Sequence, residues 1–552
     1  MKLSQLSTFK DIYQIKDNDQ LIELAQDIRD FLNDFVNKNK GHIGSNLGVV
    51  ELTLSILSYF DLEKTIVLFD TGHQSHVFKL LVHGIEKFNT LKQYKGLSNF
   101  QEIKESEYDW ISTGHSSTSL AYQFGYALAS DKQNIISVIG DAAFFGSYTL
   151  PGLINLQNTE KRTITIVNDN NQAIGENSLA IKDIKMYVES LGFKYIKCED
   201  GHDFEKLFNS FDQALNSKEH VVIHCITKKA FKYKGENELF QNHSVESKME
   251  NSYSKLIANE LEKNFTENDF LVCPAMLNSS NFDNLKNKFN KNVIDVGINE
   301  EFGILTASAI ANTGKKTFVS IYSTFFQRVF DQLVHDVFRN NLSMTFLIDR
   351  GGLNYSGGVS HHGIYDVSLV NNFENSIIAQ PYSLNDLKVL TQQSYNNKDK
   401  QFFLRYENLE AIDDQKNEEF EIGKWDEIIY NKNNRLTLIS YGNVLNDFKT
   451  NIENNNLEIN LINARYINPI DKEMIKKHKE NNIFVYEQVI NRNNLFSNIK
   501  REFNNLNLTS FAFSKTDIQH GSKELILKEL NMDVEYIINK ILEVKKHAKD
   551  SW

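Results

Sequence analysis

The stretch VIGDAAFFGSYTLPGLINLQNTEKRTITIVNDNNQAIGEN, Val138 to Asn177, decides the fold class of this chain. Two apolar runs, Ile135–Ile139 and Thr163–Val167, end abruptly at polar residues. The first run is followed by Gly140-Asp141 and the second by Asn168-Asp169-Asn170. The segment SYTLPGLINLQN between them has the pattern and length of one helix. We therefore predict a strand–helix–strand unit with two neighbouring parallel strands.

The same alternation continues along the chain. Each predicted strand reads as a continuous buried run rather than an alternating one, which is typical of strands buried on both faces. The predicted class is therefore α/β, with mainly parallel sheets covered by helices. The runs that carry this prediction are NIISVIG, RTITIVN, EHVVIHCIT, KTFVSIYS, MTFLIDR, RLTLISYG, LEINLINA and NNIFVYE.

Two polar, strand-poor stretches indicate domain boundaries, Lys232–Lys255 and Glu407–Glu427. A chain of 552 residues has material for roughly three to four ordinary domains. We predict three, with boundaries at 1–245, 246–410 and 411–552. No short-period repeat is found in the sequence.

The composition excludes several classes of protein. The N-terminus lacks the apolar core of a signal peptide, and no run approaches 18 apolar residues, so neither secretion nor membrane insertion is expected. The net charge of −12, without a basic stripe, argues against nucleic-acid binding. Cys198, Cys225 and Cys273 are odd in number and far apart, so neither a disulfide framework nor a zinc site is indicated. A reducing cytoplasm fits this cysteine usage.

The polar residues at the two strand ends admit two explanations. Ligands of open α/β sheets bind outside the carboxyl ends of the strands, where Asp141 and Asn170 are predicted to lie. A carboxylate, an amide oxygen and a backbone carbonyl suit Mg²⁺, which completes its coordination with water and phosphate oxygens. Alternatively, Asp141 caps a helix and NDNN is a turn, which is the commoner use of such residues. The stretch alone leaves both open.

Motifs elsewhere in the chain favour the first explanation. Together they resemble the 1-deoxy-D-xylulose-5-phosphate synthase family, thiamine-diphosphate enzymes of the transketolase superfamily. The resemblance covers nearly the whole chain, and GHSSTS, IYSTFFQR and HHGIYD are its most specific parts. The motifs are GHIGSNLGVVELTLSIL (41–57), FDTGHQSHVFKLL (69–81), SEYDWISTGHSSTSLAYQFGYALA (106–129), DVGINEEFGILTASAIA (295–311), IYSTFFQRVFDQLVHDVFRNNL (321–342), IDRGGLNYSGGVSHHGIYD (348–366), ARYINPID (464–471) and DIQHGSKELILKEL (517–530).

The resemblance implies a transketolase-like fold with a diphosphate-binding first domain, a pyrimidine-binding second domain and a smaller third domain. It implies a homodimer in which each active site lies between the first two domains of one subunit. The implied cofactors are thiamine diphosphate and Mg²⁺. The implied reaction condenses pyruvate with the aldose phosphate D-glyceraldehyde 3-phosphate, releasing CO₂, and feeds isoprenoid and thiamine biosynthesis.

Individual residues match the family's cofactor site. Asp141, Asn170 and the carbonyl of Gln172 match the Mg²⁺ ligands. Glu300 in GINEEF matches the carboxyl group that bonds the aminopyrimidine ring; without this context, a single glutamate is most often a surface residue. Lys229 in TKKAF is a less specific match. The other residues expected to bind the cofactor are His73, Gly114, His115, Ser116, Ala142, Ala143, Phe325 and Arg328.

The substrates require groups that handle protons beside both reacting molecules. His42 in GHIGS, His73 in TGHQS and His361 in SHHG match the family's catalytic histidines, and His243 in FQNHSV is a weaker match. Most isolated histidines are satisfied polar residues or caps, and we assign that explanation to His76, His83 and His335. Tyr322 and Arg350 match the acceptor side together with His42, His243 and His361, and Arg350 is expected to hold the sugar phosphate. For Phe325 and Arg328, helix packing and a solvated charge are the alternatives.

The chain departs from the family at three site positions. Ala142 replaces a glycine near the diphosphate. Gly357 replaces an acidic residue four positions before His361. Asn408, in RYENL, replaces a second phosphate-binding arginine, and Glu407 beside it adds a negative charge. The segment that follows Asn177 is also much shorter than in the family.

Two other functions are therefore weighed against the synthase. The first is a related thiamine-diphosphate carboligase or transketolase with another acceptor, because Gly357 and Asn408 both affect acceptor recognition. The second is a non-catalytic paralogue that binds the cofactor or partners. The retention of His42, His73, Glu300 and His361 argues against the second.

Overall fold

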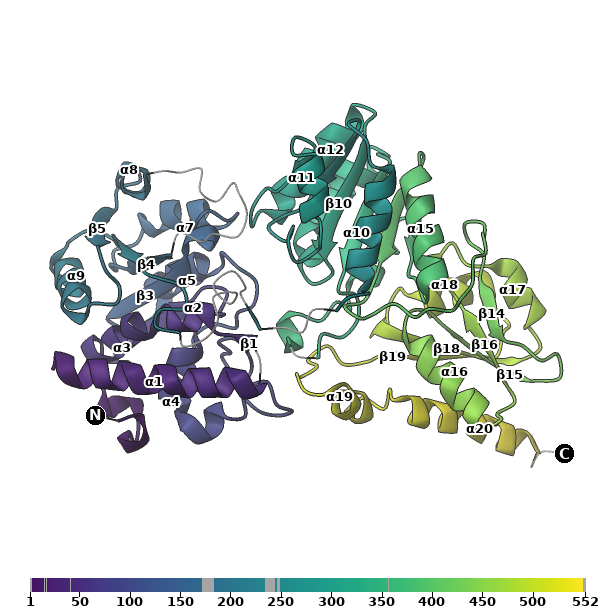
Figure 1. Cartoon of the computed structure of the whole chain (residues 1–552), viewed down its shortest axis with the longest axis horizontal. Helices are drawn as coiled ribbons and strands as arrows, with labels where there is room; N and C mark the ends of the chain where they lie inside the picture. The colour runs from purple at the N-terminus through teal and green to yellow at the C-terminus, as the bar shows by residue number, and fades with distance from the viewer. Residues whose placement is uncertain are drawn as a thin grey trace. The chain divides into compact units, whose positions relative to one another are not determined.

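The computed structural model describes residues 2–13, 15, 17–39, 41–170, 183–233, 244–245, 249–355 and 357–549. The chain forms two compact units, which are described separately (Figure 1). The first unit comprises Met1–Lys248 with Gly297–Asn299, and the second comprises Met249–Val296 with Glu300–Trp552.

The first unit is built on a five-stranded sheet whose strands are all parallel. The predicted strand–helix–strand unit is present as β3, the short α6 (Asp141–Phe144), α7 (Thr149–Leu156) and β4. The apolar run therefore stops at Asp141 because the strand ends and a helix begins there. The strand order is β2 (Thr65–Phe69), β3 (Asn134–Gly140), β4 (Ile164–Asp169), β6 (Val221–Ile226) and β5 (Lys194–Cys198).

Helices cover both faces of this sheet, as the continuous apolar runs predict. Val138 belongs to the core shared with α1, α3, α4 and α9, whereas Ile139 belongs to the core shared with α5, α7 and α8. Successive side chains of β3 thus enter different cores. The helices are α1 (Asn18–Asn39), α3 (Val50–Tyr59), α4 (His76–Phe88), α5 (Ser119–Ala129), α8 (Ile184–Ser190) and α9 (Phe204–Asn216). The smaller elements are η1 (Leu3–Gln5), η2 (Phe9–Asp11), α2 (Gly44–Leu47), and the antiparallel pair β1 (Gly41–His42) and β7 (Ser244–Val245).

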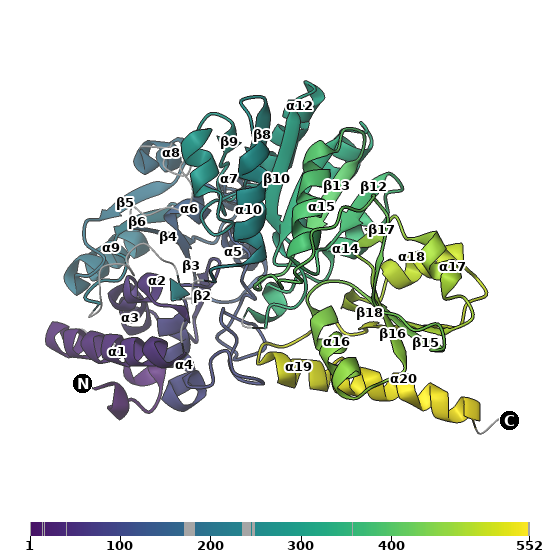
Figure 2. The ribbon, with the colours of Figure 1, turned by 45° about the vertical axis from the view of Figure 1, so that its right-hand side comes forward.

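The second unit contains two sheets. The larger has seven strands, in the order β17-β12-β13-β11-β10-β8-β9, and only β17 runs antiparallel to its neighbour among the described strands. Helices α10 (Tyr253–Asn264) and α15 (Leu384–Asn396) pack side by side on it (Figure 2). The strands are β8 (Asp269–Val272), β9 (Val293–Ile294), β10 (Lys316–Tyr322), β11 (Met344–Asp349), β12 (Ser376–Ala379), β13 (Gln401–Arg405) and β17 (Tyr466–Asn468).

The connections of this sheet carry several of the predicted site residues. Helix α12 (Glu300–Asn312) packs against β8 and β10 and contacts η5 (Phe325–Val329). The other connecting elements are α11 (Asp283–Lys288), α13 (Phe330–Gln332), the π-helical turn η6 (Leu333–Phe338), η7 (Gly358–Ser360) and α14 (Asp366–Val370).

The second sheet of this unit has five strands in the order β14-β16-β15-β18-β19, with β14 antiparallel and the others parallel. Helices α16 (Val444–Asn454) and α20 (Val534–Lys549) lie side by side and share its core. The strands are β14 (Asp426–Ile429), β15 (Leu436–Ser440), β16 (Ile459–Asn463), β18 (Asn482–Ile490) and β19 (Leu508–Phe513), and the other helices are α17 (Lys472–Lys477), α18 (Leu495–Glu502) and α19 (Lys523–Glu529).

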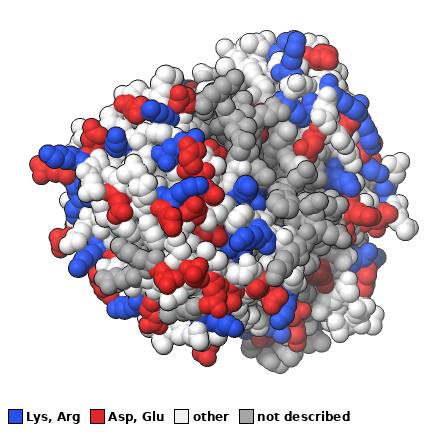
Figure 3. All heavy atoms as spheres, turned by 60° about the vertical axis from the view of Figure 1, so that its left-hand side comes forward, with Lys and Arg blue, Asp and Glu red and all other residues white. Residues whose placement is uncertain are grey.

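The predicted α/β class with mainly parallel sheets is confirmed, and each of the eight quoted runs forms a strand. The three cysteines are buried and free. Among the described residues, no helix combines the length and apolarity that crossing a membrane requires. On the face drawn in Figure 3, acidic and basic side chains are interspersed rather than separated by sign.

Candidate active site

Polar residues gather at the carboxyl ends of the strands of the first unit. Asp70 follows β2, Asp141 follows β3 and Asn170 follows β4. The three strands are consecutive and parallel in the sheet, so their ends share one edge. The position predicted for Asp141 and Asn170 from the sequence is therefore the position that they occupy.

Asp141 has an incomplete set of hydrogen bonds. Its Oδ1 accepts the N–H of Ala142 at 2.8 Å, and its buried Oδ2 has no hydrogen-bond partner among the described residues. Burial, together with the nearby Asp169, raises the pKa of Asp141 to about 6. A buried carboxylate oxygen without a donor is costly unless a cation or proton accompanies it. The residues present thus fit a bound cation at this strand end.

Lys229 and His73 complete the electrostatics of this edge. Lys229 is buried; burial lowers the pKa of its ammonium, although the charge of Asp141 opposes that shift. Burial and the charge of Lys229 lower the pKa of His73 to about 4, so its ring is neutral at neutral pH. The edge therefore combines the carboxylates of Asp70, Asp141 and Asp169 with one ammonium and a neutral imidazole.

Asp70, which the sequence analysis did not single out, holds the loop that contains Gly114, His115 and Ser116. Its carboxylate accepts the N–H groups of Ser117 at 2.8 Å and Ser119 at 2.9 Å. Ser117 has a positive φ of 68°, a conformation that costs energy for a side-chain-bearing residue. The signal for Asp70 was available, because FDTGH places it at a strand end just as VIGD places Asp141.

In the second unit, Glu300 and Arg328 form a buried ion pair. Glu300 begins α12, Arg328 lies on η5, and their Oε2 and Nη1 atoms are 3.1 Å apart. The side chains are only 6% and 7% exposed. Burial raises the pKa of Glu300 despite the opposing charge of Arg328. Arg328 is therefore not the solvated charge that was one alternative for it.

Four further predicted residues form one continuous group. The Arg350 guanidinium lies 4.3 Å from the centre of the Tyr322 ring. Tyr322 stacks with Phe325 at 5.9 Å between ring centroids, and Phe325 meets His361 edge-on at 6.1 Å. Arg350 adopts a φ of 60°, an unusual conformation of the kind that concentrates at functional sites.

Unsatisfied polar atoms gather at the same edge of the seven-stranded sheet. Buried groups in native proteins nearly always find partners, so a cluster without them within the described chain indicates a place for a ligand or water. Burial also raises the pKa of Asp349 to about 6. The atoms are Ser320 Oγ, Tyr322 Oη, Ser323 Oγ, Asp349 Oδ1 and Tyr406 Oη, from the carboxyl-terminal ends of β10, β11 and β13.

Two of the departures from the family have visible consequences. A Cβ atom at Gly357 would lie 2.7 Å from Cβ of His361 and 3.0 Å from Cγ of Asn354, so Asn354 fills the space of a side chain there. Asn408 is exposed. Glu407 turns to the start of α16, where its Oε2 accepts the N–H of Asn443 at 3.1 Å.

Some predicted residues lie outside the described part of the chain. These are Gln172 and His243, and for His42 only the backbone is described, paired with Ser244 in β1 and β7. The segment after Asn177, up to residue 182, is likewise outside it. Ala142 and Ala143 lie in the short α6, and the carbonyl of Ala143 accepts the Ser117 hydroxyl at 2.8 Å.

Another group could hold a metal, namely His83, Glu105 and Asp109. Lys79 already forms an ion pair with Glu105, and His83 lies 3.1 Å from Asp109. The buried ammonium of Lys79 supplies the positive charge that a metal would bring, so the group is explained as an internal charge network.

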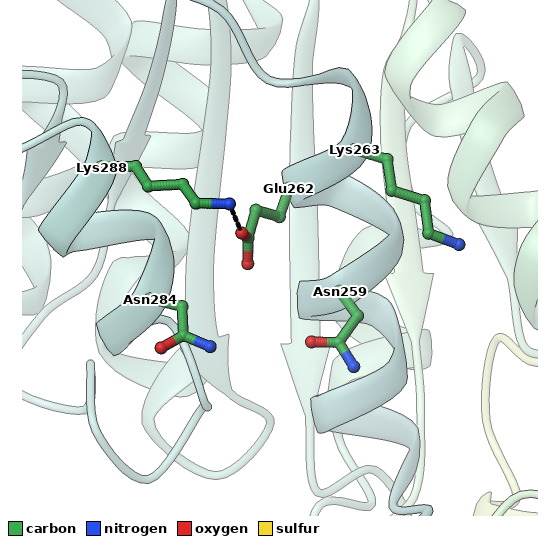
Figure 4. Close-up of a pocket in the computed structure, with 5 residues that line it drawn as sticks. All are labelled: Asn259, Glu262, Lys263, Asn284 and Lys288. Atoms are coloured by element: carbon green, nitrogen blue, oxygen red, sulfur yellow. Dashed lines mark hydrogen bonds and ion pairs between the residues drawn. The ribbon is translucent and has the colours of Figure 1, made fainter.

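A surface hollow between α10 and α11 is a poor candidate for the active site (Figure 4). An ion pair between Lys288 and Glu262 crosses it. Lys288 ends α11, shortly before β9 begins at Val293, so the hollow lies toward the amino ends of the strands. Ligands of such sheets bind at the opposite ends.

Comparison with known proteins gives matches over nearly the whole chain. The family model for 1-deoxy-D-xylulose-5-phosphate synthase matches residues 3–187, and the model for the transketolase pyrimidine-binding domain matches residues 249–411. The chain is 33% identical to the 1-deoxy-D-xylulose-5-phosphate synthase of Malacoplasma penetrans, over 98% of this chain and 99% of that protein. The synthase of Clostridium tetani is 30% identical over 98% and 100%, respectively. The solved transketolase of Campylobacter jejuni aligns with a TM-score of 0.44 at 16% identity, covering 94% of this chain and 98% of that one.

Proposed function

The chain belongs to the 1-deoxy-D-xylulose-5-phosphate synthase family, and from this premise we propose how its residues divide the work of the family's reaction. That reaction condenses pyruvate with D-glyceraldehyde 3-phosphate, releases CO₂ and forms 1-deoxy-D-xylulose 5-phosphate. The chain is accordingly a transferase of the transketolase type, in isoprenoid biosynthesis. The observation that carries this conclusion is the match to such synthases over 98% of the chain. That match favours the synthase over a carboligase with another acceptor and over a non-catalytic paralogue.

The proposed cofactors are thiamine diphosphate and Mg²⁺. The family and the matched pyrimidine-binding domain imply thiamine diphosphate. Asp141, Asn170 and the carbonyl of Gln172 would hold the ion, and the unpartnered Oδ2 of Asp141 supports this assignment. When bound, the thiazolium ring of the cofactor would accept the electron pair that CO₂ leaves behind when the carbon–carbon bond of pyruvate breaks.

The other residues of the first unit would surround the diphosphate. The Lys229 ammonium would offset its negative charge, which also favours the protonated form of this buried lysine. The backbone of the loop that Asp70 orders would present its N–H groups to the phosphate oxygens. His73, Gly114, His115, Ser116, Ala142 and Ala143 complete this part of the proposed site.

Glu300 would bond the aminopyrimidine ring of the cofactor. Burial raises the pKa of Glu300, so this carboxyl shares a proton more readily than an exposed one. Arg328 would hold Glu300 in place through their ion pair. Phe325, stacked on Tyr322, would contribute an apolar wall to the pyrimidine pocket.

Tyr322, Arg350 and His361 would bind the aldehyde substrate. Arg350 would hold the phosphate by charge-assisted hydrogen bonds, and its position over the Tyr322 ring restricts where the guanidinium lies. His361 would move protons to or from the acceptor oxygen. We assign His42 and His73 of the first unit to proton transfer as well, and His243 to substrate binding.

We propose that the protein is a homodimer. Helices α5 and α7 are neighbours, and they expose Tyr122 at 41%, Leu128 at 64%, Leu150 at 45% and Ile154 at 48%. Apolar side chains gathered on adjacent helices are typical of interaction surfaces. Sedimentation should give a dimer that Leu128→Lys with Ile154→Lys dissociates. Ile22→Lys, an exposed apolar position on α1, should leave it intact, and a monomeric wild type would refute the proposal.

The three domains, 1–245, 246–410 and 411–552, also remain a proposal. The three large sheets and the family models over residues 3–187 and 249–411 support it. A cytoplasmic location is proposed because the three cysteines are free, as in a reducing compartment.

Product identification tests the proposed function directly. The protein is incubated with pyruvate, Mg²⁺, thiamine diphosphate and a panel of aldehydes, with and without phosphate groups. We expect 1-deoxy-D-xylulose 5-phosphate from D-glyceraldehyde 3-phosphate. A different preferred aldehyde would assign the chain to another carboligase, and binding of the cofactor without any product would assign it to a non-catalytic role.

A further inference from the structure

The His361 loop is held by a segment that lies more than 150 residues away in sequence. The loop, Gly352–Gly363, is closed at its base, where the two glycines exchange backbone hydrogen bonds of 2.7 and 2.8 Å. The distant segment is Ile518–Gly521, which follows β19 of the five-stranded sheet in the second unit. His361 is the loop residue with a role in the proposed function, whereas other residues of the loop make the contacts with Ile518–Gly521.

His362 joins the two segments through both nitrogens of its ring. The backbone N–H of Asn354 donates to Nδ1 at 3.0 Å, and Nε2 donates to the carbonyl of Ile518 at 2.8 Å. Nδ1 must therefore be unprotonated and Nε2 must carry the proton. This is one tautomer of the neutral imidazole. Burial, with the charge of His520, lowers the pKa of His362 to about 4, in agreement with a neutral ring.

Two further contacts join the loop to the same segment. The N–H of Gly521 donates to the carbonyl of Tyr355 at 2.9 Å. Gly358 has a φ of +70°, and a Cβ atom there would lie 3.1 Å from Cβ and 3.3 Å from Nδ1 of His520. The two segments of the chain thus approach closely at a position that favours glycine. These contacts, with those of His362, meet the loop on both sides of His361.

On its other side the loop is tied to the turn that follows β10 of the seven-stranded sheet. The hydroxyl of Thr324 donates to the carbonyl of Ser360 at 2.8 Å, directly before His361. Thr324 itself lies between Tyr322 and Phe325, two residues of the proposed site. The backbone on either side of His361 is therefore held by Thr324, beside the proposed site, and by Ile518, in the third domain.

We propose that His362 is a positioning residue, which ties the His361 loop to the Ile518–Gly521 segment and so fixes His361 against the aldehyde acceptor. The proposal rests on the proposed function, because it gives His361 its role from there. Reacting groups tolerate little displacement, since a shift of about 1 Å can cost on the order of 100-fold in rate. The third domain would in this way contribute to acceptor turnover without contacting either substrate.

Two variants of His362 and one control test this inference in the full-length protein with cofactors. His362→Leu removes both hydrogen bonds, whereas His362→Gln retains one acceptor and one donor. The control is His478→Leu. His478 is an equally buried histidine of the third domain whose nitrogens contact Thr437 and Glu427, away from the loop.

We expect His362→Leu to lower kcat/KM for D-glyceraldehyde 3-phosphate by at least ~10-fold, with the KM of pyruvate within about twofold of wild type, because only the acceptor side is displaced. His362→Gln should recover most of the loss, and His478→Leu should show none. The inference is wrong if both leucine variants lower kcat/KM equally, or if glutamine is no better than leucine.

Amide hydrogen exchange keeps the test independent of activity and of global folding. In His362→Leu, peptides that cover 351–365 and 514–522 should both exchange faster, whereas in His478→Leu neither should change. Unchanged exchange in His362→Leu would overturn the inference even if wild type makes the expected product. Absence of that product in wild type would instead overturn the proposed function, and the exchange result would still decide whether His362 ties the segments.

Discussion

Glu300 is the residue on which the proposed chemistry depends most directly. We predict that Glu300→Gln leaves the fold and cofactor binding largely intact but lowers turnover by at least ~100-fold, the scale of a lost acid–base contribution. The amide keeps the shape of the side chain beside Arg328. Steady-state kinetics at saturating cofactor measure the effect, with the neighbouring Glu301→Gln as control. Near-normal turnover of Glu300→Gln would move the role elsewhere, first to Glu301.

Asn408 is the residue at which acceptor binding departs from the family. A charge-assisted hydrogen bond to phosphate contributes roughly 1.5 to 3 kcal/mol. The KM of D-glyceraldehyde 3-phosphate should therefore be ~10- to 100-fold higher than in an enzyme with arginine at this position. Arg405 cannot substitute, because Asp366, at 2.7 Å, and the carbonyl of Gly363, at 2.9 Å, hold it. Glu407 faces Asn443, which reduces the repulsion expected from its charge.

Asn408→Arg should therefore partly restore phosphate recognition. We expect a lower KM for D-glyceraldehyde 3-phosphate, greater discrimination against unphosphorylated D-glyceraldehyde, and pyruvate kinetics close to wild type. Leu409→Arg, at the next exposed position, adds the same charge without the matched position. If wild type already prefers the phosphorylated aldehyde by several thousandfold and the new arginine changes nothing, other residues bind the phosphate.

Among the structural elements, the His361 loop contains a histidine, His362, that should make the free energy of unfolding depend on pH. The pKa of His362 is about 4 in the folded protein, whereas an unfolded histidine titrates near 6.5. The folded state binds fewer protons than the unfolded state in this range. The contribution of His362 to the free energy of unfolding is therefore complete above about pH 6.5 and is lost as the pH falls toward 4. At pH 5 the loss is about 2 kcal/mol.

His362→Gln should remove this part of the pH dependence, because glutamine does not titrate. The measurement is the difference in unfolding free energy between wild type and variant at pH 7 and pH 5. We expect that difference to fall by about 2 kcal/mol at the lower pH. The exposed His335→Gln serves as control. A difference that stays constant with pH would show that His362 titrates normally in the folded protein.

The elements that the sequence predicted best are the buried parallel strands. The runs that lead to Asp141 and Tyr322 are mostly apolar because helices cover both faces of the sheet, and that pattern is local in the sequence. Strand β17 was not predicted, since Tyr466–Asn468 is short and is defined by pairing with the distant β12. The same limit applies within the candidate site. HHG identified a histidine pair, but only the contacts with Asn354 and Ile518 distinguish His362 from His361.

At the scale of the whole molecule, cofactor binding should appear as added stability. A ligand that binds only the folded state at 100 times its Kd stabilises it by about 2.7 kcal/mol. We predict a rise in Tm when Mg²⁺ and thiamine diphosphate are added together, most of which Asn170→Ala abolishes. Asn155→Ala, an exposed asparagine on α7, should retain the full rise. An unchanged rise in Asn170→Ala would leave the strand ends as only a helix cap and a turn.

Strand β17 has a consequence for anyone who divides the chain into pieces. It comes from beyond residue 411 yet forms the outermost strand of the seven-stranded sheet, beside β12. A fragment that stops at residue 410 would leave the edge of β12 bare, and bare edges pair with other copies and aggregate. Light scattering should therefore find such a fragment associated. The boundary at residue 410 is therefore a poor place to divide the chain. A fragment that contains the seven-stranded sheet must also contain β17.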